Sequence, residues 1–229
     1  RGTSLHGIES EPEKLKPITQ LKAPMDFSNP NFVLKFWMLS SGSGPSIFYY
    51  SYDKGHSWRG PFSLAVDSLT KIAARVDYIL EDNNSCMAFF TAAKADDSEG
   101  RVFTARTDDG GLSWQFVAWV GEELENGFRI MPSTVRTSEN ELLLTSRVRM
   151  ASENVNELSS GENSKSRYID SWLSTNNGKN WEYQGKPVDN LGEGNPPSLI
   201  KLQDGRLCLT YGFRAAPFSI CAKISEDNG

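Results

Sequence analysis

Hydrophobic residues occur along this chain in short runs that are separated by polar turns. The runs are rich in β-branched and aromatic residues, and the turns are rich in Gly, Asp, Asn and Ser. This pattern is typical of β-strands joined by tight connections, so it predicts an all-β fold. The clearest runs are residues 47–50, 102–105, 115–120, 168–173 and 220–224.

One short motif recurs directly after four of these runs. Its form is Ser/Thr-x-Asp/Asn-x-Gly-x-x-Trp, complete at residues 51–58, 107–114 and 174–181 and present in its first five positions at 225–229. The Asp or Asn side chain can accept backbone N–H bonds, the glycine supplies a positive φ, and the tryptophan is large enough to pack the turn onto a neighbour. The motif therefore predicts a structural hairpin turn between two strands.

A second repeat lies between the turns. Residues 132–149 align with 197–214 as strand, polar turn and strand, and residues 76–93 form a less regular copy. Each unit then contains four strands and recurs every 50 to 65 residues or so, which is the spacing of a β-propeller blade. We predict a polar N-terminal arm at residues 1–30 and a partial propeller of about four four-stranded blades at 31–229.

Amino-acid composition limits the classes of partner and site that the chain can have. The chain has 229 residues, is 38% hydrophobic and carries a net charge of −5. Its longest apolar runs are far too short to cross a bilayer, and its acidic charge argues against a nucleic-acid partner. With two histidines there is little material for a histidine-rich metal site, and we expect no metal and no cofactor. No signal peptide is recognisable at the start of the sequence.

The turn motif resembles the Asp-box, or BNR repeat, of the sialidase superfamily. The run GEGNPPSLIKLQDGRLCLTYGFR (192–214) and the run IAARVDY (72–78) are also similar to bacterial sialidase-like BNR proteins. This resemblance implies a six-bladed propeller, of which the chain would be a fragment with open blade edges that favour self-association. It also implies a sialidase-like glycoside hydrolase whose partner is a glycan, sialylated or otherwise acidic, in the periplasm or outside the cell.

The resemblance also implies particular site chemistry. Sialidases bind the substrate carboxylate with three arginines and use a tyrosine nucleophile, a glutamate and an acid/base aspartate. Loops at one end of the blades and the starts of the innermost strands are where such residues belong. We therefore expect Asp77 and Glu193 to be catalytic. The expected substrate-binding residues are Arg75, Arg136, Arg149, Asn195, Tyr211 and Arg214.

Several of these assignments have competing interpretations. Arg75 and Asp77 share one side of a predicted strand, so they fit either an acid with a cation in the site or a buried ion pair between blades. Glu193 and Arg214 are farther apart than in the family's element, and Tyr211 fits packing better than nucleophilic attack. Arg129 lies in a near-match to the family's arginine signature that carries one extra residue. A glycan- or protein-binding propeller without catalysis and a polysaccharide lyase remain alternatives.

Overall fold

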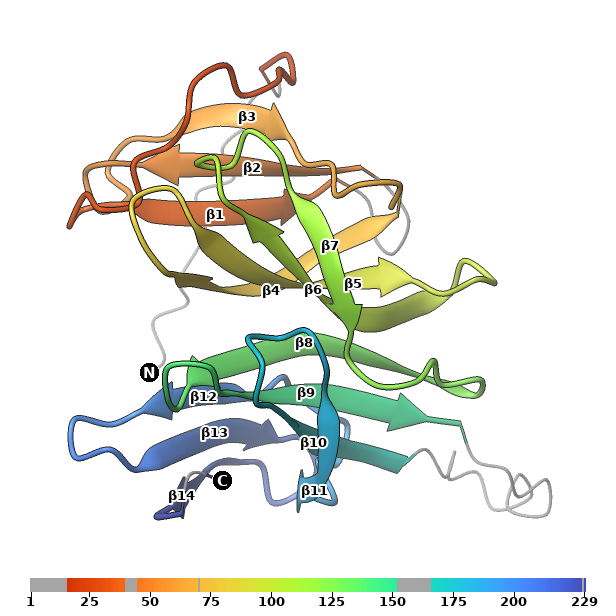
Figure 1. The fold of residues 1–229 in the computed structure, drawn as a ribbon. Helices are drawn as coiled ribbons and strands as arrows, with labels where there is room; N and C mark the ends of the chain where they lie inside the picture. The colour runs from red at the N-terminus through yellow and green to blue at the C-terminus, as the bar shows by residue number, and fades with distance from the viewer. Residues whose placement is uncertain (1–15, 40–44, 70, 152–165, 228) are drawn as a thin grey trace, which may run out of the picture.

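The computed structural model describes residues 16–39, 45–69, 71–151, 166–227 and 229 (Figure 1). In these residues the chain forms fourteen strands and no helix, arranged as four antiparallel sheets. The first sheet contains β1 (Val33–Met38), β2 (Ser46–Ser51) and β3 (Arg59–Ser63). The second contains β4 (Ile72–Leu80), β5 (Cys86–Ala93), β6 (Glu99–Thr107) and β7 (Gln115–Trp119). The third contains β8 (Gly127–Arg136), β9 (Leu142–Met150), β10 (Ser166–Ser174) and β11 (Glu182–Val188). The fourth contains β12 (Ser198–Lys201), β13 (Leu207–Phe213) and β14 (Ser219–Ser225).

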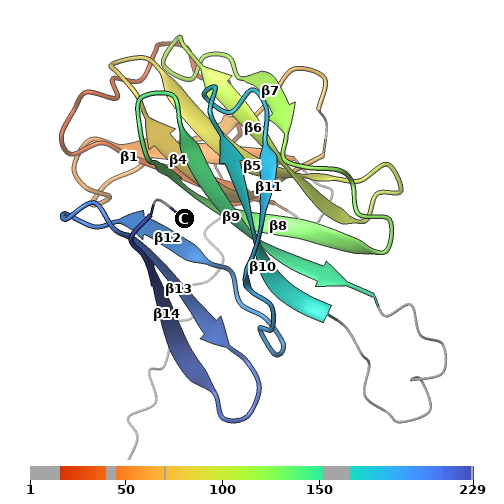
Figure 2. The ribbon, with the colours of Figure 1, turned by 60° about the horizontal axis from the view of Figure 1, so that its bottom comes forward.

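The four sheets follow one another in chain order as a stack (Figure 1). Strand β1 contacts β4, β4 contacts β8, and β8 contacts β12, so neighbouring sheets meet along these strands. In Figure 2 the fourth sheet lies beside β8 and β9, at the end of the series. The predicted all-β architecture of consecutive blade-like sheets is confirmed.

Strand number differs from the prediction in the two outer sheets, which have three strands each. In the complete sheets the turn formed by the Ser/Thr-x-Asp/Asn-x-Gly-x-x-Trp motif joins the third strand to the fourth, as between β6 and β7 or β10 and β11. We call it the Asp-box turn after the motif that its sequence resembles. In the first sheet the turn joins β2 to β3, so the described residues supply no innermost strand there. In the fourth sheet the turn follows β14, so no described strand follows it.

The Asp-box turns contain the predicted hydrogen bonds. In the first turn the Ser51 hydroxyl donates to the Asp53 carboxylate at 2.6 Å and accepts the N–H of Gly55 at 2.9 Å. The Asp53 carboxylate also accepts the N–H of Ser57 at 2.8 Å. The same bonds recur in the turns at 107–113 and 174–180, and the first part of the set recurs at 225–229. Gly55 has φ +85°, which explains why glycine recurs at this position.

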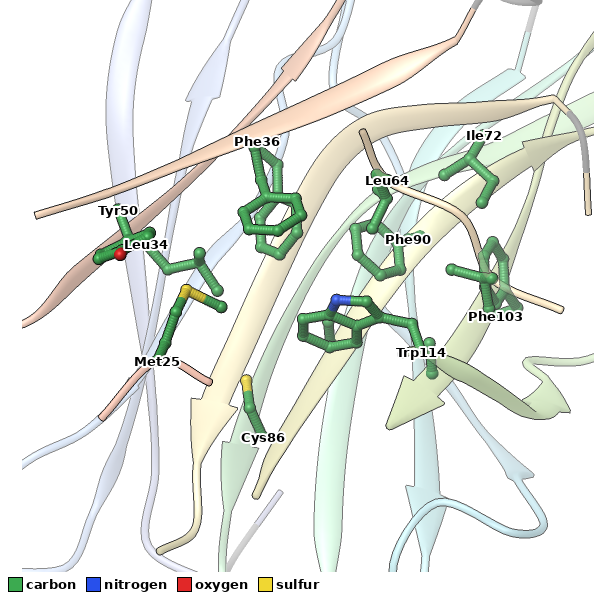
Figure 3. Close-up of a cluster of buried hydrophobic side chains, with 14 of the residues drawn as sticks. Met25, Leu34, Phe36, Tyr50, Leu64, Ile72, Cys86, Phe90, Phe103 and Trp114 are labelled. Carbon is green, nitrogen blue, oxygen red and sulfur yellow. The ribbon is translucent and has the colours of Figure 1, made fainter. Parts of the chain in front are cut away.

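Aromatic and aliphatic side chains fill the spaces between the sheets. Figure 3 shows Trp114, from the second turn, with Phe36 of the first sheet and Phe90 of the second, at ring-centroid distances of 5.8 Å and 6.0 Å. The Trp181 indole N–H donates to the Thr104 hydroxyl of the second sheet at 3.1 Å. Each of these tryptophans therefore packs its turn onto the preceding sheet, as predicted. Trp58 does not follow this rule and is 38% exposed.

Part of the segment that we assigned to a polar arm joins this core. Residues 1–15 lie outside the described residues, but Met25 and Phe27 are buried in the cluster between the first and second sheets. The Met25 N–H donates to the carbonyl oxygen of Gly110 at 2.8 Å, in the second Asp-box turn. The chain before β1 therefore contributes to the packing of the first two sheets.

Candidate functional site

Two inner strands carry bulges close to one another. Strand β4 changes register between Ala73 and Asp77, and β8 changes register between Ile130 and Ser133. Bulges redirect side chains and are common beside active sites. Here they border a cavity of about 390 Å³ between β4, β8 and the segment that precedes β12. Its lining residues are Arg75, Val76, Asp77, Met131, Pro132, Ser133, Pro196 and Pro197.

Asp77 is a largely buried carboxylate in the wall of this cavity. One of its oxygens accepts the backbone N–H of Thr134 on β8 at 2.6 Å, and the other accepts the N–H of Tyr78 at 2.9 Å. Burial raises the pKa of Asp77 above its ordinary value, although these hydrogen bonds favour the charged form. The carboxyl group therefore holds a proton more readily than an exposed aspartate does.

Ser133 occupies the matching position on the next inner strand. Its hydroxyl oxygen accepts the N–H of Leu199 on β12 at 2.9 Å. Asp77 and Ser133 thus each provide an acceptor for the inner strand of the following sheet, and both line the cavity. The connection between sheets and the cavity wall are therefore made by the same side chains.

Several arginines gather at the end of the molecule where β4 and β8 begin and β9 ends. We call this group, which consists of Arg75, Arg147, Arg149 and Arg167, the arginine rim. Arg75 forms an ion pair with Glu99 at 2.5 Å. Arg147 and Arg149 of β9 each lie 5.8 Å from the centre of the Phe128 ring. Within the described part of the chain, neither of these two forms an ion pair, whereas Arg75 does.

The pKa of the Arg147 guanidinium is lowered by its burial among the other arginines of the rim. Burial is the largest cause of a lowered pKa for its guanidinium, and the negative charge of Glu99 opposes that shift. Three nearby positive charges reinforce it, those of Arg75, Arg149 and Arg167. A group of like charges held in a partly buried place is stabilised when an anion binds, so the arginine rim favours an anionic ligand.

The loop between β11 and β12 lies against the same rim. Glu193 forms an ion pair with Arg167 at 2.6 Å, and Arg214 donates to the carbonyl oxygen of Gly194 at 3.2 Å. A Cβ atom on Gly194 would lie 3.2 Å from Nε of Arg147, so a larger residue there would crowd the arginine. The structure therefore places the predicted residues Glu193 and Arg214 on the loop that borders the arginine rim.

Two further predicted residues of this region, Asn195 and Tyr211, lie against the protein's own strands and core. A Cβ atom on Gly212 would lie 2.4 Å from the amide nitrogen of Asn195, so the Asn195 side chain rests directly on β13. Tyr211 packs against the apolar cluster between the third and fourth sheets, and burial raises its pKa. A raised pKa opposes formation of the tyrosinate, which is consistent with the packing interpretation of Tyr211.

Arg136 is not brought to the arginine rim. It lies at the opposite end of β8, where it forms an ion pair with Glu81 and donates to the Asn177 side chain at 2.6 Å. Asn177 belongs to the third Asp-box turn, and Arg106 forms a further ion pair with Glu81. Arg136 therefore connects neighbouring sheets at the turns, because its place near the end of β8 carries it away from the bulge.

Arg129 is not among the residues that line the cavity. Its Nε donates to the Asp170 carboxylate at 2.8 Å, and both side chains are almost fully buried. Its guanidinium also donates to the carbonyl oxygens of Val120 and Glu122 and lies 4.7 Å from the centre of the Trp172 ring. This pair joins the end of the second sheet to the third, which is a structural role.

Glu99, which pairs with Arg75, and Arg147 of the arginine rim were not among our candidates. Glu99 opens β6 and Arg147 lies near the end of β9, so both reach the rim through strands that are not the innermost ones. The signal that could have found them is their position at the correct end of predicted strands. Among the described residues, no group of three or more metal-ligating side chains is close enough to hold a metal ion, and no helix is long and apolar enough to span a membrane.

The sequence matches no protein-family model and no curated protein. Solved structures do match the fold. The α-L-arabinofuranosidase Arb93A of Fusarium graminearum, in complex with an iminosugar inhibitor, has a TM-score of 0.63 at 15% identity over 90% of this chain and 62% of that chain. An α-L-arabinanase of Penicillium chrysogenum with bound arabinobiose has a TM-score of 0.59 at 17% identity, with the same coverage of the two chains.

A protein of unknown function from Dyadobacter fermentans is similar in the same way, with a TM-score of 0.61 at 19% identity over 83% of this chain and 50% of that chain. The chain thus spans between half and about three fifths of the length of these structures. At such identities the likeness concerns the fold alone. It confirms the predicted β-propeller class.

Proposed function

We propose that this chain carries the substrate site of a glycan-acting hydrolase, and that its glycan is sialylated or otherwise acidic. The observation that carries the proposal is the cavity that is lined both by Asp77, a largely buried carboxyl group, and by Arg75 of the arginine rim. A glycosidase needs a proton donor for the leaving group, and one that acts on an acidic sugar also needs positive groups that bind its carboxylate. This region supplies both kinds of group.

Asp77 is the proposed general acid. An acid must hold a proton at the working pH, and burial of Asp77 raises its pKa in the required direction. In the reaction the bond between the anomeric carbon and the glycosidic oxygen breaks, and Asp77 gives its proton to that oxygen. Water then supplies a hydroxyl group to the anomeric carbon, and its remaining proton returns to a carboxylate.

Glu193 is the proposed base for that water. Its side chain is 64% exposed and forms an ion pair with Arg167, which holds the carboxylate in place while it stays accessible to solvent. Arg75 and Arg149 are the proposed contacts for a substrate carboxylate, since a planar guanidinium binds a carboxylate through two parallel hydrogen bonds. Arg214 supports the loop that carries Glu193 through its bond to Gly194.

A neutral glycan is the second candidate substrate. Two of the proteins with this fold are named for arabinose-containing substrates, and one of them holds arabinobiose. A neutral substrate would not need the positive charge of the arginine rim. Comparison of acidic with neutral substrates therefore separates the two candidates.

The test is an assay of the full-length gene product against fluorogenic sialosides, linear arabinan and fluorogenic arabinofuranosides. Asp77→Asn removes the proposed acid but retains an oxygen that can accept the Thr134 N–H. We expect it to lower kcat by a factor of about 100 or more, whereas Asp204→Asn, a change of an exposed aspartate in a hairpin, leaves kcat unchanged.

The same assay separates the other interpretations. Binding without turnover of any substrate would favour a glycan-binding propeller. Products with a new carbon–carbon double bond would favour a lyase. Wild-type turnover that survives Asp77→Asn would show that the acid lies elsewhere.

A further inference from the structure

Glu99 is an acidic residue beside the arginine rim. It follows the turn at residues 94–98, which joins β5 to β6, and it is the first residue of β6. The next residue, Gly100, packs closely on β5. A Cβ atom on Gly100 would meet the Thr91 side chain and would lie 2.9 Å from the carbonyl oxygen of Ala92. The backbone that carries Glu99 is therefore held in place by the sheet rather than by a loop.

Arg75 binds Glu99 and also lines the cavity. The two side chains form an ion pair at 2.5 Å, and they are 24% and 29% exposed. A guanidinium carries five N–H groups, so Arg75 can bind a second carboxylate without releasing Glu99. That second carboxylate would be the one on the substrate, for which Arg75 is a proposed contact. Two negative charges would then share one positive charge.

The charge of Glu99 reaches a second arginine of the rim. Burial lowers the pKa of the Arg147 guanidinium, and the negative charge of Glu99 opposes that shift. Glu99 therefore interacts with Arg147 as well as with Arg75. An anion in this place reduces the positive potential that a ligand meets at both arginines.

Glu193 also forms an ion pair with an arginine of the rim, but it differs from Glu99 in exposure. Its side chain is 64% exposed and lies on a loop, where solvent and salt screen its charge. The Glu99 side chain is 29% exposed and begins a strand, so its charge is screened less. Of these two carboxylates, Glu99 therefore has the stronger effect on an anion that binds at Arg75.

The carboxylate of an acidic sugar is not altered by glycoside hydrolysis. Contacts to it are made in the substrate and remain in the product, so they tighten binding of both and do not by themselves raise kcat. Product release limits the turnover of many enzymes, and very strong contacts to an acidic product would slow that step. A nearby carboxylate that weakens these contacts would favour release.

We propose that Glu99 is a specificity-determining residue that weakens the binding of acidic ligands at Arg75 and leaves the binding of neutral ligands unchanged. The cause is repulsion between its carboxylate and that of the ligand, which a neutral sugar does not meet. The inference rests on the proposed function for the acidic character of the glycan. It concerns binding, so its test does not require turnover.

The experiment compares the wild type with Glu99→Gln in the full-length gene product. The amide removes the negative charge but keeps the shape and an oxygen that can accept a hydrogen bond from Arg75. The matched control is Glu81→Gln, because Glu81 also forms an ion pair with arginines, Arg106 and Arg136, and Arg136 lies at the end of β8 away from the rim. Nuclear magnetic resonance titrations measure the dissociation constants of N-acetylneuraminic acid, glucuronic acid and the neutral arabinobiose.

We expect Glu99→Gln to bind at least one of the two acids about three- to tenfold more tightly than the wild type and to leave arabinobiose binding unchanged. The gain should shrink as salt is added, because salt screens the interaction between partly exposed charges. Glu81→Gln should bind all three probes as the wild type does. Glu99→Asp keeps the negative charge and should show no gain.

Four outcomes would overturn the proposal. Weaker binding of the acids by Glu99→Gln would show that Glu99 supports Arg75 rather than opposing the ligand. Unchanged binding of the acids would show that its charge does not reach them. An equal gain for the acids and for arabinobiose would assign the effect to a change of shape. Absence of acid binding in both the wild type and Glu99→Gln would show that the rim is not an anion site.

Failure of the proposed function gives a different result. A protein that binds an acid more tightly after Glu99→Gln but hydrolyses no glycoside would support the role of Glu99 and refute the hydrolase. Turnover of arabinofuranosides that is lost in Asp77→Asn, with no effect of Glu99→Gln on any probe, would support a hydrolase. That second result would refute both the role of Glu99 and the acidic glycan.

Discussion

The Asp77 carboxylate on β4 accepts the backbone N–H of Thr134 on β8, with 2.6 Å between the nitrogen and the oxygen. Asp77 therefore joins the second sheet to the third and also lines the cavity. A change at this position is expected to affect stability as well as chemistry. Experiments on the site need measurements that separate the two effects.

The stability contribution of Asp77 should depend on pH. Its pKa is raised in the folded protein because of burial, so the folded state binds the proton more tightly than the unfolded state does. The resulting stabilisation is fully present below the ordinary pKa of an aspartate and is lost as the pH rises through the raised value. Asp77→Asn cannot titrate. We expect thermal melts to show that the wild type loses stability relative to Asp77→Asn as the pH rises above the ordinary pKa of an aspartate. A constant difference would contradict the raised pKa.

The arginine rim should discriminate acidic from neutral substrates. Arg149→Met removes a charge that has no acidic partner among the described residues and keeps most of the side-chain volume. We expect KM for an acidic glycan to rise about tenfold, with little change for a neutral glycan. Arg206→Met, at an exposed hairpin ion pair with Asp204, is the control. An equal effect of Arg149→Met on both substrates would remove the argument for an acidic glycan.

The tryptophans of two equivalent turns should differ in their contribution to stability. Trp114 is 4% exposed and packs onto the first sheet, whereas Trp58 is 38% exposed. Trp114→Ala should lower the free energy of unfolding by about 3–5 kcal/mol, as removal of a packed aromatic side chain does. Trp58→Ala should lower it by about 1 kcal/mol or less. Denaturant titrations of the two variants would measure the difference, and equal losses would contradict this account of the turns.

Gly110 should be sensitive to replacement because the chain before β1 lies on it. A Cβ atom there would lie 2.7 Å from the carbonyl oxygen and 2.9 Å from the nitrogen of Met25, which are backbone atoms. Gly205 also has a positive φ, but nothing lies within 4 Å of its Cβ position. Both alanine variants carry backbone strain, and Gly110→Ala should cost about 1–3 kcal/mol more, measured by urea denaturation. Similar costs would show that residues 24–25 are displaced easily.

The last strand should promote self-association. Among the described strands β14 pairs only with β13, and its outer residue Ile220 is 92% exposed. Unpaired edges with apolar side chains associate readily. We expect light scattering to show association that grows with concentration and that weakens in Ile220→Lys. The control, Leu112→Lys, changes an exposed residue of the second turn and should have no effect. A wild type that stays monomeric at all concentrations would contradict the prediction.

Local sequence was sufficient to predict the turns and the sheets. Ser51, Asp53 and Gly55 are bonded to one another within five residues, so the motif that contains them specifies its own conformation wherever it occurs. The strands on either side follow from the alternation and composition of their residues. Two features were missed. The first and fourth sheets have three described strands each rather than four, and Met25 and Phe27 of the predicted arm are buried in the core.

The site could be predicted only in part. Asp77 and Arg75 were chosen because they lie on a predicted inner strand, and both line the cavity. Glu193 and Arg214 were chosen because of a family resemblance, and both lie at the loop before β12, while the roles of all four residues stay predictions. Arg136 was placed with them, although it lies at the other end of β8 and pairs with Glu81. The bulge that interrupts β8 has no clear signal in the sequence. The sequence therefore did not show that Arg136 lies at the end of β8 away from the cavity.

By itself, the sequence determined the repeating unit, because the bonds of each turn and the pairing of successive strands join residues that are near one another in the chain. The tertiary structure decided which side chains meet across sheets. Thr134 lies far from Asp77 in sequence, and Glu193 lies opposite Arg167 only because the loop before β12 returns to the start of β10. Such pairs depend on how neighbouring sheets stack, and stacking is set by the packing of many side chains together rather than by any local motif.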